Sequence, residues 1–329
     1  MLKAFAALDE PQPGVAWRER FRAHWPETRS WYLKQGLAAR PTVAEAQFAL
    51  EHHMPELMPI YRRLCSLAGE DDVACRWLSC WNSPPLFDGC SVAVWLGDGG
   101  PALMRNYDFE LNLTAGRIER SCWLGRSVIA MTGGLRGPWG ALDGMNQDGL
   151  AAALTFGGSS THGRGFAMAL VLRYILETCR TAGEAVSALI RIPVGMSQNA
   201  VIVDRTGAHA TVFLNPDRAA RVSDELVCTN HQDGTVSPGW EARTQTLARQ
   251  RHLATRLAAA RNGVPELVDA LLAPPLYRRL RPGGFGTVYT AAYRPLEGAC
   301  EYRWPGKTWR QAFNRFEPGV YSHDYAAVT

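Results

Sequence analysis

The stretch "PPLFDGCSVAVWLGDGGPALMRNYDFE", residues 84–110, decides the fold prediction. Cys90 follows Gly89 at the start of a β-like run, and "GDGG" separates this run from a second apolar run ending in "RNYDFE". Two such runs around a Gly-rich turn are typical of a β-hairpin. The turn brings Arg105 and Asp108 back toward the strand that bears Cys90. We therefore expect a thiol and two opposite charges to lie close together.

The composition is that of an ordinary globular protein. The chain has 329 residues, of which 47% are hydrophobic and 20% charged, enough for one large or two ordinary domains. Its formal net charge is +4, and basic residues gather only in "YRRLRP" at 277–282, so no nucleic-acid partner is predicted. The N-terminus lacks an apolar run of signal-peptide length, and "FAMALVLRYILETC" is too short to span a bilayer. We therefore expect a cytoplasmic protein with no membrane partner.

The eight cysteines form neither a Cys-x-x-Cys pair nor a His-x-Cys cluster. In a cytosolic chain such residues are mostly free thiols that pack as small hydrophobic groups, so no metal site is predicted. Cys90 is distinguished from the others only by its neighbours.

The order of predicted elements favours an α+β fold. Residues 1 to about 80 have apolar residues at helical spacing, and residues after Cys90 form paired strands around Gly, Asp or Asn turns. Helices are expected between these hairpins, one pair divided near Gly183 and a charged one over 240–263. Strands in runs with helices in blocks indicate antiparallel sheets layered with helices rather than βαβ units. "PPLFDG" is the best candidate for a boundary.

A thiol at the head of a strand becomes reactive if the peptide bond before it is cut. The new α-amino group, with an ordinary pKa of about 7.7–8.0, can serve as a base on the same residue as the nucleophile. Gly89 suits a scissile position because it lacks Cβ. Arg105 would stabilise a thiolate and Asp108 would hold the new ammonium, although an ordinary surface ion pair is an equally good reading of these two residues.

Four segments together resemble a known family: "DGCSVAVW", "LMRNYDFE", "LDGMNQDGLAAALTFGG" and "CTNHQ" at 228–232. Their order and spacing are similar to those of the N-terminal-nucleophile (Ntn) hydrolases of the peptidase C45 group, which includes the acyl-CoA:6-aminopenicillanic acid acyltransferases. The choloylglycine hydrolase and penicillin V acylase group is more distantly similar. The resemblance extends from about residue 40 to residue 305.

The resemblance implies an Ntn-hydrolase fold, a four-layer αββα sandwich of antiparallel sheets. Residues 1–89 would be a helical pro-segment or small subunit, and residues 90–329 the catalytic domain. Self-cleavage after Gly89 would expose Cys90 as the nucleophile, making the uncut chain a zymogen. Arg105 and Asp108 match the residues that orient the thiol and the amino group. Asn230 matches the side-chain donor to the oxyanion.

The family also uses an arginine beyond the Asn-His element. Arg249 in "TLAR" matches it best, with Thr246 in place of the family's serine, and Arg243 competes for the role. A solvated position on a charged helix is an equally good reading of Arg249.

The implied chemistry starts from a small-molecule amide or thioester and passes through a thioester acyl-enzyme, which water would hydrolyse or an amine acceptor would take over by acyl transfer. Acyl-amides and acyl-CoA are the expected substrates, and no cofactor or metal is expected. After cleavage the N-terminal segment would remain as a partner, and an oligomer is possible.

Two other readings stay open. One is an uncleaved cysteine hydrolase with His162, His209 or His231 as its base. The other is a non-catalytic binding module on the same scaffold, because a fold does not fix a function. Aromatic residues could line an acyl pocket, although core packing explains each of them at least as well: Phe87, Trp95, Tyr107, Trp123, Trp139 and Phe156.

Overall fold

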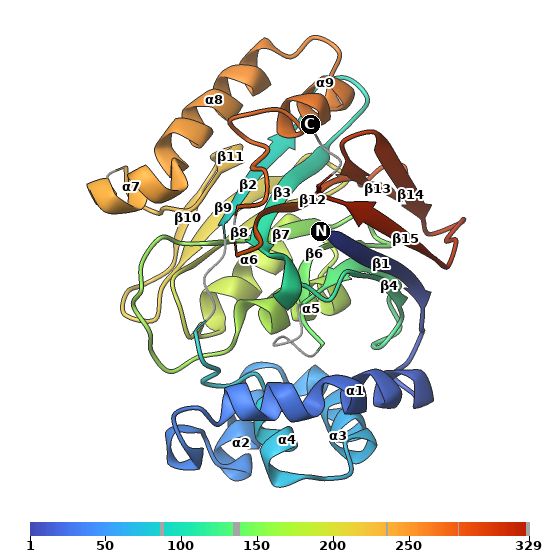
Figure 1. The fold of residues 1–329 in the computed structure, drawn as a ribbon, viewed down its shortest axis with the longest axis vertical. Coiled ribbons are helices and arrows are strands. Elements are labelled where there is room, and N and C mark those ends of the chain that lie inside the picture. Colours follow the sequence, from blue (N-terminus) through green and yellow to red (C-terminus); the bar gives the residue numbers. More distant parts are fainter. Residues whose placement is uncertain (86–88, 134–138, 235, 282, 327–329) are drawn as a thin grey trace.

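The computed structural model describes residues 1–85, 89–133, 139–234, 236–281 and 283–326. These residues form two β-sheets that lie face to face, with helices on both outer faces and a separate helical block at one end (Figure 1).

The larger sheet has nine strands in the order β10-β9-β8-β7-β6-β5-β4-β1-β15. Their bounds in this order are Arg221–Ser223, His209–Leu214, Gln198–Val203, Ala151–Phe156, Ala141–Asn146, Val128–Thr132, Arg117–Ser121, Leu2–Asp9 and Gly319–Asp324. Neighbouring strands pair antiparallel except β1 and β4, which are parallel. The prediction of antiparallel sheets therefore holds apart from this one pair.

The smaller sheet has six antiparallel strands in the order β11-β2-β3-β12-β13-β14. Their bounds are Val227–Cys228, Gly89–Trp95, Ala102–Glu110, Phe285–Arg294, Ala299–Trp304 and Lys307–Ala312. The hairpin predicted from residues 84–110 is β2 and β3, in the middle of this sheet.

Two helical layers complete the sandwich. Helices α5 (Met168–Thr178) and α6 (Ala182–Arg191) pack on the nine-stranded sheet, whereas α8 (Thr246–Ala259) and α9 (Val264–Leu271) pack on the six-stranded sheet. Strands β2 and β3 contact β7 across the interface between the sheets. The predicted four-layer αββα architecture is therefore confirmed.

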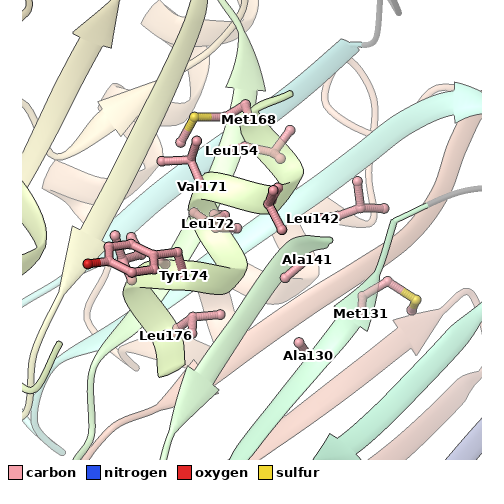
Figure 2. Close-up of a cluster of buried hydrophobic side chains, with 14 of the residues drawn as sticks. Ala130, Met131, Ala141, Leu142, Leu154, Met168, Val171, Leu172, Tyr174 and Leu176 are labelled. Atoms are coloured by element: carbon pink, nitrogen blue, oxygen red, sulfur yellow. The ribbon is translucent and has the colours of Figure 1, made fainter. Parts of the chain in front are cut away.

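Helix α5 shows how the apolar pattern builds these layers. This helix packs along β6: a Cβ at Gly144 would lie 2.9 Å from the Leu176 side chain, and Figure 2 shows Leu172 and Leu176 on the helix. The helix ends at Thr178, and α6 begins after Thr181, whose hydroxyl accepts a hydrogen bond from the backbone N–H of Glu184. The division predicted near Gly183 is therefore present over residues 179–181, where Thr181 caps α6, and Gly183 itself lies inside α6.

The helical block comprises α1 (Val15–Tyr32), α2 (Val43–His53), α3 (Met58–Leu67) and α4 (Asp72–Leu78). Short 3-10 helices lie at Leu37–Ala39, Pro55–Leu57 and Leu111–Leu113, and α7 is Pro238–Thr244. Thr42 and Glu45 form a reciprocal capping box at the start of α2. The indole Nε1 of Trp139 donates to the carbonyl of Leu78 at 2.7 Å, which ties the block to the sandwich.

The helical prediction for residues 1 to about 80 is wrong at its beginning. Residues 2–9 form β1, which pairs with β4 on one side and β15 on the other. Phe5 and Ala7 point into the core with 0% and 1% of their surface exposed, at the two-residue period of a strand. Partners more than 100 residues away override the local helical preference here.

Substitution of Phe5 tests how much β1 contributes to stability. Phe5→Ala should lower the free energy of unfolding by about 3–5 kcal/mol, because it removes a buried ring and leaves a cavity. Leu2→Ala is the matched control, since Leu2 lies on the same strand with 72% of its surface exposed. Urea denaturation should show a change within about 0.5 kcal/mol for this control. Equal effects for both variants would contradict the placement of β1 in the core.

Among the described residues, no helix combines the length and the apolar character that crossing a membrane requires.

Candidate active site

Cys90 lies on β2, a central strand of the six-stranded sheet, with β11 and β3 as its neighbours. It is fully buried and is paired in register with Tyr107 of β3. The guanidinium Nη2 of Arg105 donates to its sulfur at 2.7 Å. Arg105 and Tyr107 are two residues apart on β3, so both side chains lie on the same face of the sheet as the Cys90 side chain.

The buried ion pair of Arg105 is with Asp143 on the opposite sheet. Nη1 of Arg105 donates to the Asp143 carboxylate and to the Leu142 carbonyl, each at 2.9 Å. Both members of the Arg105–Asp143 ion pair are 0% exposed, which excludes the surface-pair reading of Arg105. Asp143 was not predicted from the sequence. Asp143 lies on β6 of the opposite sheet. The only sequence feature that pointed to it is its place in the motif segment "LDGMNQDGLAAALTFGG".

Asp108 lies on β3 directly opposite Gly89 in the strand register. Its Oδ1 accepts a hydrogen bond from the Thr287 hydroxyl at 2.7 Å, and its Oδ2 lies 3.9 Å from Nη1 of Arg249. Burial raises the pKa of Asp108, while the nearby Arg249 and Arg278 limit the rise. The carboxylate is thus beside the peptide bond predicted to be cut.

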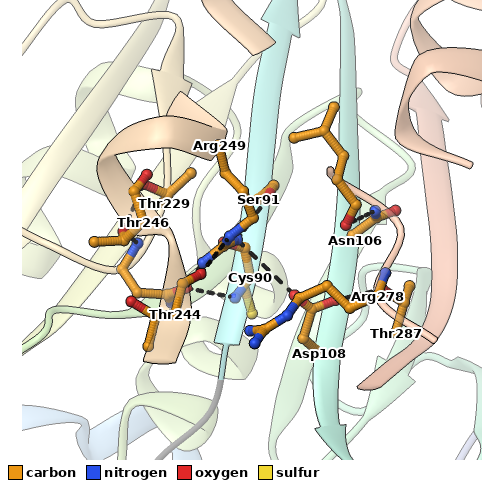
Figure 3. Close-up of polar contacts among 12 residues, drawn as sticks. Cys90, Ser91, Asn106, Asp108, Thr229, Thr244, Thr246, Arg249, Arg278 and Thr287 are labelled. Atoms are coloured by element: carbon orange, nitrogen blue, oxygen red, sulfur yellow. Dashed lines mark hydrogen bonds and ion pairs between the residues drawn. The ribbon is translucent and has the colours of Figure 1, made fainter. Parts of the chain in front are cut away.

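Arg249 reaches from α8 to the backbone of β2, as Figure 3 shows. Its Nη1 donates to the Cys90 carbonyl at 2.6 Å and to the Ser91 hydroxyl at 2.7 Å, and its Nη2 donates to Oδ1 of Asn230 at 2.8 Å. Asn230 Oδ1 also accepts from the backbone N–H of Cys90 at 2.8 Å. The structure therefore brings all five predicted catalytic residues together around the Gly89–Cys90 bond.

The two candidate arginines occupy different environments. Arg249 is fully buried, whereas Arg243 is exposed and stacks on Trp240, its guanidinium carbon 4.8 Å from the ring centroid. Arg249 is the one that contacts Cys90 and Asn230. The reading of Arg249 as a solvated helix residue is wrong, because this face of α8 packs on β2.

The histidines proposed as alternative bases make hydrogen bonds elsewhere. His162 pairs with the Ser83 carbonyl, and His209 with the carbonyls of Gly207 and Asp224. His231 lies beside Asn230 and bonds the hydroxyls of two threonines, Thr229 and Thr246, through Nδ1. Burial lowers the pKa of His231, which favours its neutral form. These contacts give a separate histidine base little support.

Two further side chains, Thr246 and Asn199, hold the Asn230 loop in place. The Thr246 hydroxyl accepts the backbone N–H of Asn230 at 2.8 Å. Asn199 donates from Nδ2 to the carbonyls of Thr229 and His231, each at 3.2 Å. The sequence carried no signal for the Asn199 contacts, because they join strands about 30 residues apart.

Two cavities lie near the cleavage point. One, about 100 Å³ in volume, is mainly apolar and is lined by Tyr107, Leu142, Leu154, Phe166 and Met168 among others. The second, about 630 Å³, includes Gly89 itself. Its wall carries the aromatic rings of Phe156, Trp240 and Phe285 and the guanidinium-bearing residues Arg243, Arg278 and Arg281.

Of the aromatic residues considered for an acyl pocket, Tyr107 and Phe156 line these two cavities. Trp123 and Trp139 line a different cavity against α1, and Trp95 lines a groove beside α8. Phe87 lies outside the described residues. Within the described part of the chain, no cluster of three or more His, Cys, Asp or Glu side chains could hold a metal ion.

Two facing sheets between helical layers, with a cysteine near the start of a central strand, define the chain as an Ntn hydrolase in fold. Residues 95–309 match the model of the family described as acyl-coenzyme A:6-aminopenicillanic acid acyl-transferase, so the chain belongs to that family. The match includes Arg105, Asp108, Asn230 and Arg249 and begins just after Cys90.

A solved structure supports the fold assignment. Penicillin V acylase from Agrobacterium tumefaciens aligns with a TM-score of 0.50 and 14% identity, over 71% of this chain and 90% of that one. Two others align at lower scores. An N-acylethanolamine-hydrolyzing acid amidase ortholog from Caenorhabditis elegans gives 0.47 and 15% identity, over 71% and 100% of the two chains. A mutant of conjugated bile acid hydrolase from Clostridium perfringens gives 0.45 and 14%, over 72% and 97%. No curated protein matches the sequence.

Proposed function

We propose that the protein is a self-processing cysteine acylase or acyltransferase in which Cys90 is the nucleophile. The observation that carries the proposal is the pair of contacts at this residue. Arg105 donates to the Cys90 sulfur at 2.7 Å, and Asn230 accepts from the Cys90 backbone nitrogen at 2.8 Å. One residue thus has a cation at its sulfur and an acceptor at the nitrogen that cleavage would turn into an amine.

Self-cleavage begins in the uncut chain. The Cys90 sulfur attacks the Gly89 carbonyl carbon, the C–N bond breaks, and the nitrogen takes the proton that the thiol has lost. Water then hydrolyses the Gly89 thioester, which leaves a carboxylate on Gly89 and a free amine on Cys90. The amine donates to Asn230 Oδ1, and Asp108 offers a negative charge to the ammonium form that exists while the group holds the thiol proton. The fragment 1–89 stays bound because β1 lies between two strands of the large sheet.

Turnover of an external substrate uses the same atoms. The α-amino group of Cys90 accepts the thiol proton, and the sulfur attacks an amide or thioester carbonyl. The side-chain amide of Asn230 has two N–H donors, one of which bonds the Phe156 carbonyl at 3.3 Å, so the second can donate to the oxyanion. The leaving group departs with the proton from the ammonium, and water or an amine acceptor takes the acyl group from the sulfur.

The cavities suggest the kind of substrate. The apolar cavity beside Tyr107 suits an aliphatic or aromatic acyl group. Arg243, Arg278 and Arg281 line the second cavity, and guanidinium groups favour phosphate or carboxylate groups. Acyl-CoA carries both an acyl chain and phosphates and is therefore a candidate substrate beside acyl-amides.

The test is to trap the acyl-enzyme. Purified protein is mixed with hexanoyl-CoA or with an N-hexanoyl amide, quenched in acid, and analysed by intact mass. We expect the fragment starting at Cys90 to gain one hexanoyl group and Cys90→Ala to gain none. A processed protein that reacts with neither type of substrate would favour a binding module instead.

Gly89→Ala tests the fit around the cleavage point. A Cβ at residue 89 would lie 3.2 Å from Cβ of Asp108 and 3.4 Å from the ring of Phe285, so one of these neighbours must shift. We expect self-cleavage to slow by about 10- to 100-fold, because a small displacement of reacting atoms is costly. Gly234→Ala is the control, since a Cβ there meets nothing within 4 Å. A time course by gel electrophoresis measures both rates, and equal rates would count against a close fit at Gly89.

Location in the cytoplasm, the absence of a cofactor and the possibility of an oligomer remain predictions from the sequence.

A further inference from the structure

A buried network of charged and hydroxyl groups contacts the Cys90 sulfur through Arg105 and connects the six-stranded sheet to the nine-stranded sheet. Arg105 of β3 donates to the sulfur through Nη2 and to the Asp143 carboxylate through Nη1, at 2.7 and 2.9 Å. Arg105 and Asp143 are both fully buried. An isolated pair of this kind would leave the guanidinium charge largely neutralised by the carboxylate.

Asp143 is shared with two tyrosines of β12. The Tyr289 hydroxyl donates to Oδ2 of Asp143 at 2.5 Å, and the Tyr293 hydroxyl donates to Oδ1. The Tyr302 hydroxyl of β13 lies 2.9 Å from that of Tyr293. Because Tyr293 gives its proton to Asp143, Tyr302 must be the donor in this second bond.

The protonation states follow from these contacts. Two hydroxyls and one guanidinium N–H all lie within hydrogen-bond distance of the Asp143 carboxylate, an arrangement that favours its ionised form, which only accepts. Burial raises the pKa of Asp143, and Arg105 and the two hydroxyls oppose the rise. Burial and the Asp143 carboxylate raise the pKa of Tyr289 and Tyr293 well above the ordinary tyrosine value, so both remain donors.

Each hydroxyl that bonds the carboxylate spreads its negative charge away from Arg105. The guanidinium is then less neutralised by Asp143 and attracts the sulfur anion more strongly. We infer that Asp143, Tyr289 and Tyr293 form a positioning network that sets how strongly Arg105 stabilises the Cys90 thiolate. This inference rests on the proposed role of Cys90 as the nucleophile.

The network makes two substitutions act in opposite directions. Tyr293→Phe removes one hydroxyl and leaves a more concentrated negative charge beside Arg105, so thiolate formation should need a higher pH. Asp143→Asn removes the negative charge itself, so thiolate formation should need a lower pH. A merely structural role would not give opposite shifts. Other groups lie close to the network and are left unchanged by these variants. Tyr107, Cys300 and Tyr302 lie around Arg105 and Asp143. Asp108 acts on Arg105 by charge, and Arg249 donates to the Cys90 carbonyl.

The experiment measures how the alkylation of Cys90 depends on pH. Processed protein reacts with iodoacetamide between about pH 5 and pH 10, and the mass of the Cys90 peptide gives the rate. We expect the midpoint to rise by about 0.5–1 pH unit in Tyr293→Phe and in Tyr289→Phe, about the effect of one hydrogen bond. The midpoint should fall in Asp143→Asn. Tyr61→Phe is the control, because the Tyr61 hydroxyl is also buried but bonds the Cys75 carbonyl in the helical block.

The tyrosine variants keep the test decisive if Asp143→Asn does not fold, since each removes a single oxygen. Midpoints in Tyr289→Phe and Tyr293→Phe equal to that of Tyr61→Phe would overturn the inference. A shift in the same direction for Asp143→Asn and Tyr293→Phe would also overturn it. A wild-type protein that is not processed, or whose Cys90 does not react, would overturn the proposed function and the inference with it.

Discussion

Cys90→Ala should leave the chain in one piece and without activity. Intact mass under denaturing conditions should show residues 1–89 and 90–329 as separate fragments for the wild type and a single full-length chain for the variant. Acyl transfer should fall on the order of 10⁴-fold or more, because both the nucleophile and the amino group that activates it are lost. The fold should remain, since the substitution removes only one buried sulfur atom.

Cys228→Ala is the matched control for this experiment. Cys228 is also buried, and it lies on β11, paired with Val92 two residues beyond Cys90. Burial raises the pKa of its thiol to about 12, so it stays protonated at neutral pH. This variant should still divide into the two fragments. A wild-type chain that stays whole after long incubation would contradict the mechanism, and cleavage in Cys90→Ala would assign it to another group.

The sequence predicted those parts of the fold whose signals are local. The hairpin that carries Cys90 was predicted because a Gly-rich turn separates two apolar runs, and α6 because apolar residues recur at helical spacing. Strand β1 was missed because both of its partners come from distant parts of the chain. The turn signal "EPQPG" at 10–14 separates these eight residues from the helices that follow, but it does not say whether they form a helix or a strand.

The residues of the candidate site were predicted from the sequence, but their hydrogen-bond and ion-pair partners were not. Cys90, Arg105 and Asp108 came from the Gly-Cys junction and the hairpin, and Asn230 came from motif resemblance; both sources give identities and not partners. The ion pair between Arg105 and Asp143 joins opposite sheets, and strand order in sequence does not show which side chains face each other across the interior. The same limit left Arg243 and Arg249 undecided. Only the packing of α8 on β2 distinguishes the two.

Arg249→Ala should be among the most damaging single substitutions outside the nucleophile. The guanidinium holds the Cys90 carbonyl, the Ser91 hydroxyl and the Asn230 side chain, and its nearest carboxylate is that of Asp108. Removing it takes a charged donor away from three buried acceptors and leaves the buried Asp108 carboxylate with Arg278 as the main cation nearby. Breaking a buried pair in this way costs about 3–5 kcal/mol of the free energy of unfolding. Self-cleavage should slow by about 100-fold or more, because the backbone that carries the nucleophile loses its anchor.

Comparison with Arg249→Lys and Arg243→Ala separates geometry from charge. Lysine keeps the positive charge but cannot bond three acceptors through a rigid fork, so Arg249→Lys should recover part of the stability and little of the cleavage rate. Arg243→Ala removes an exposed guanidinium from α7, the helix just before α8, and should change stability by about 0.5 kcal/mol or less in urea denaturation. If Arg249→Ala is as stable as Arg243→Ala and is cleaved at the wild-type rate, Arg249 has no part in holding the site. If Arg249→Lys restores cleavage fully, charge alone is sufficient and the hydrogen-bonded fork does not position Cys90.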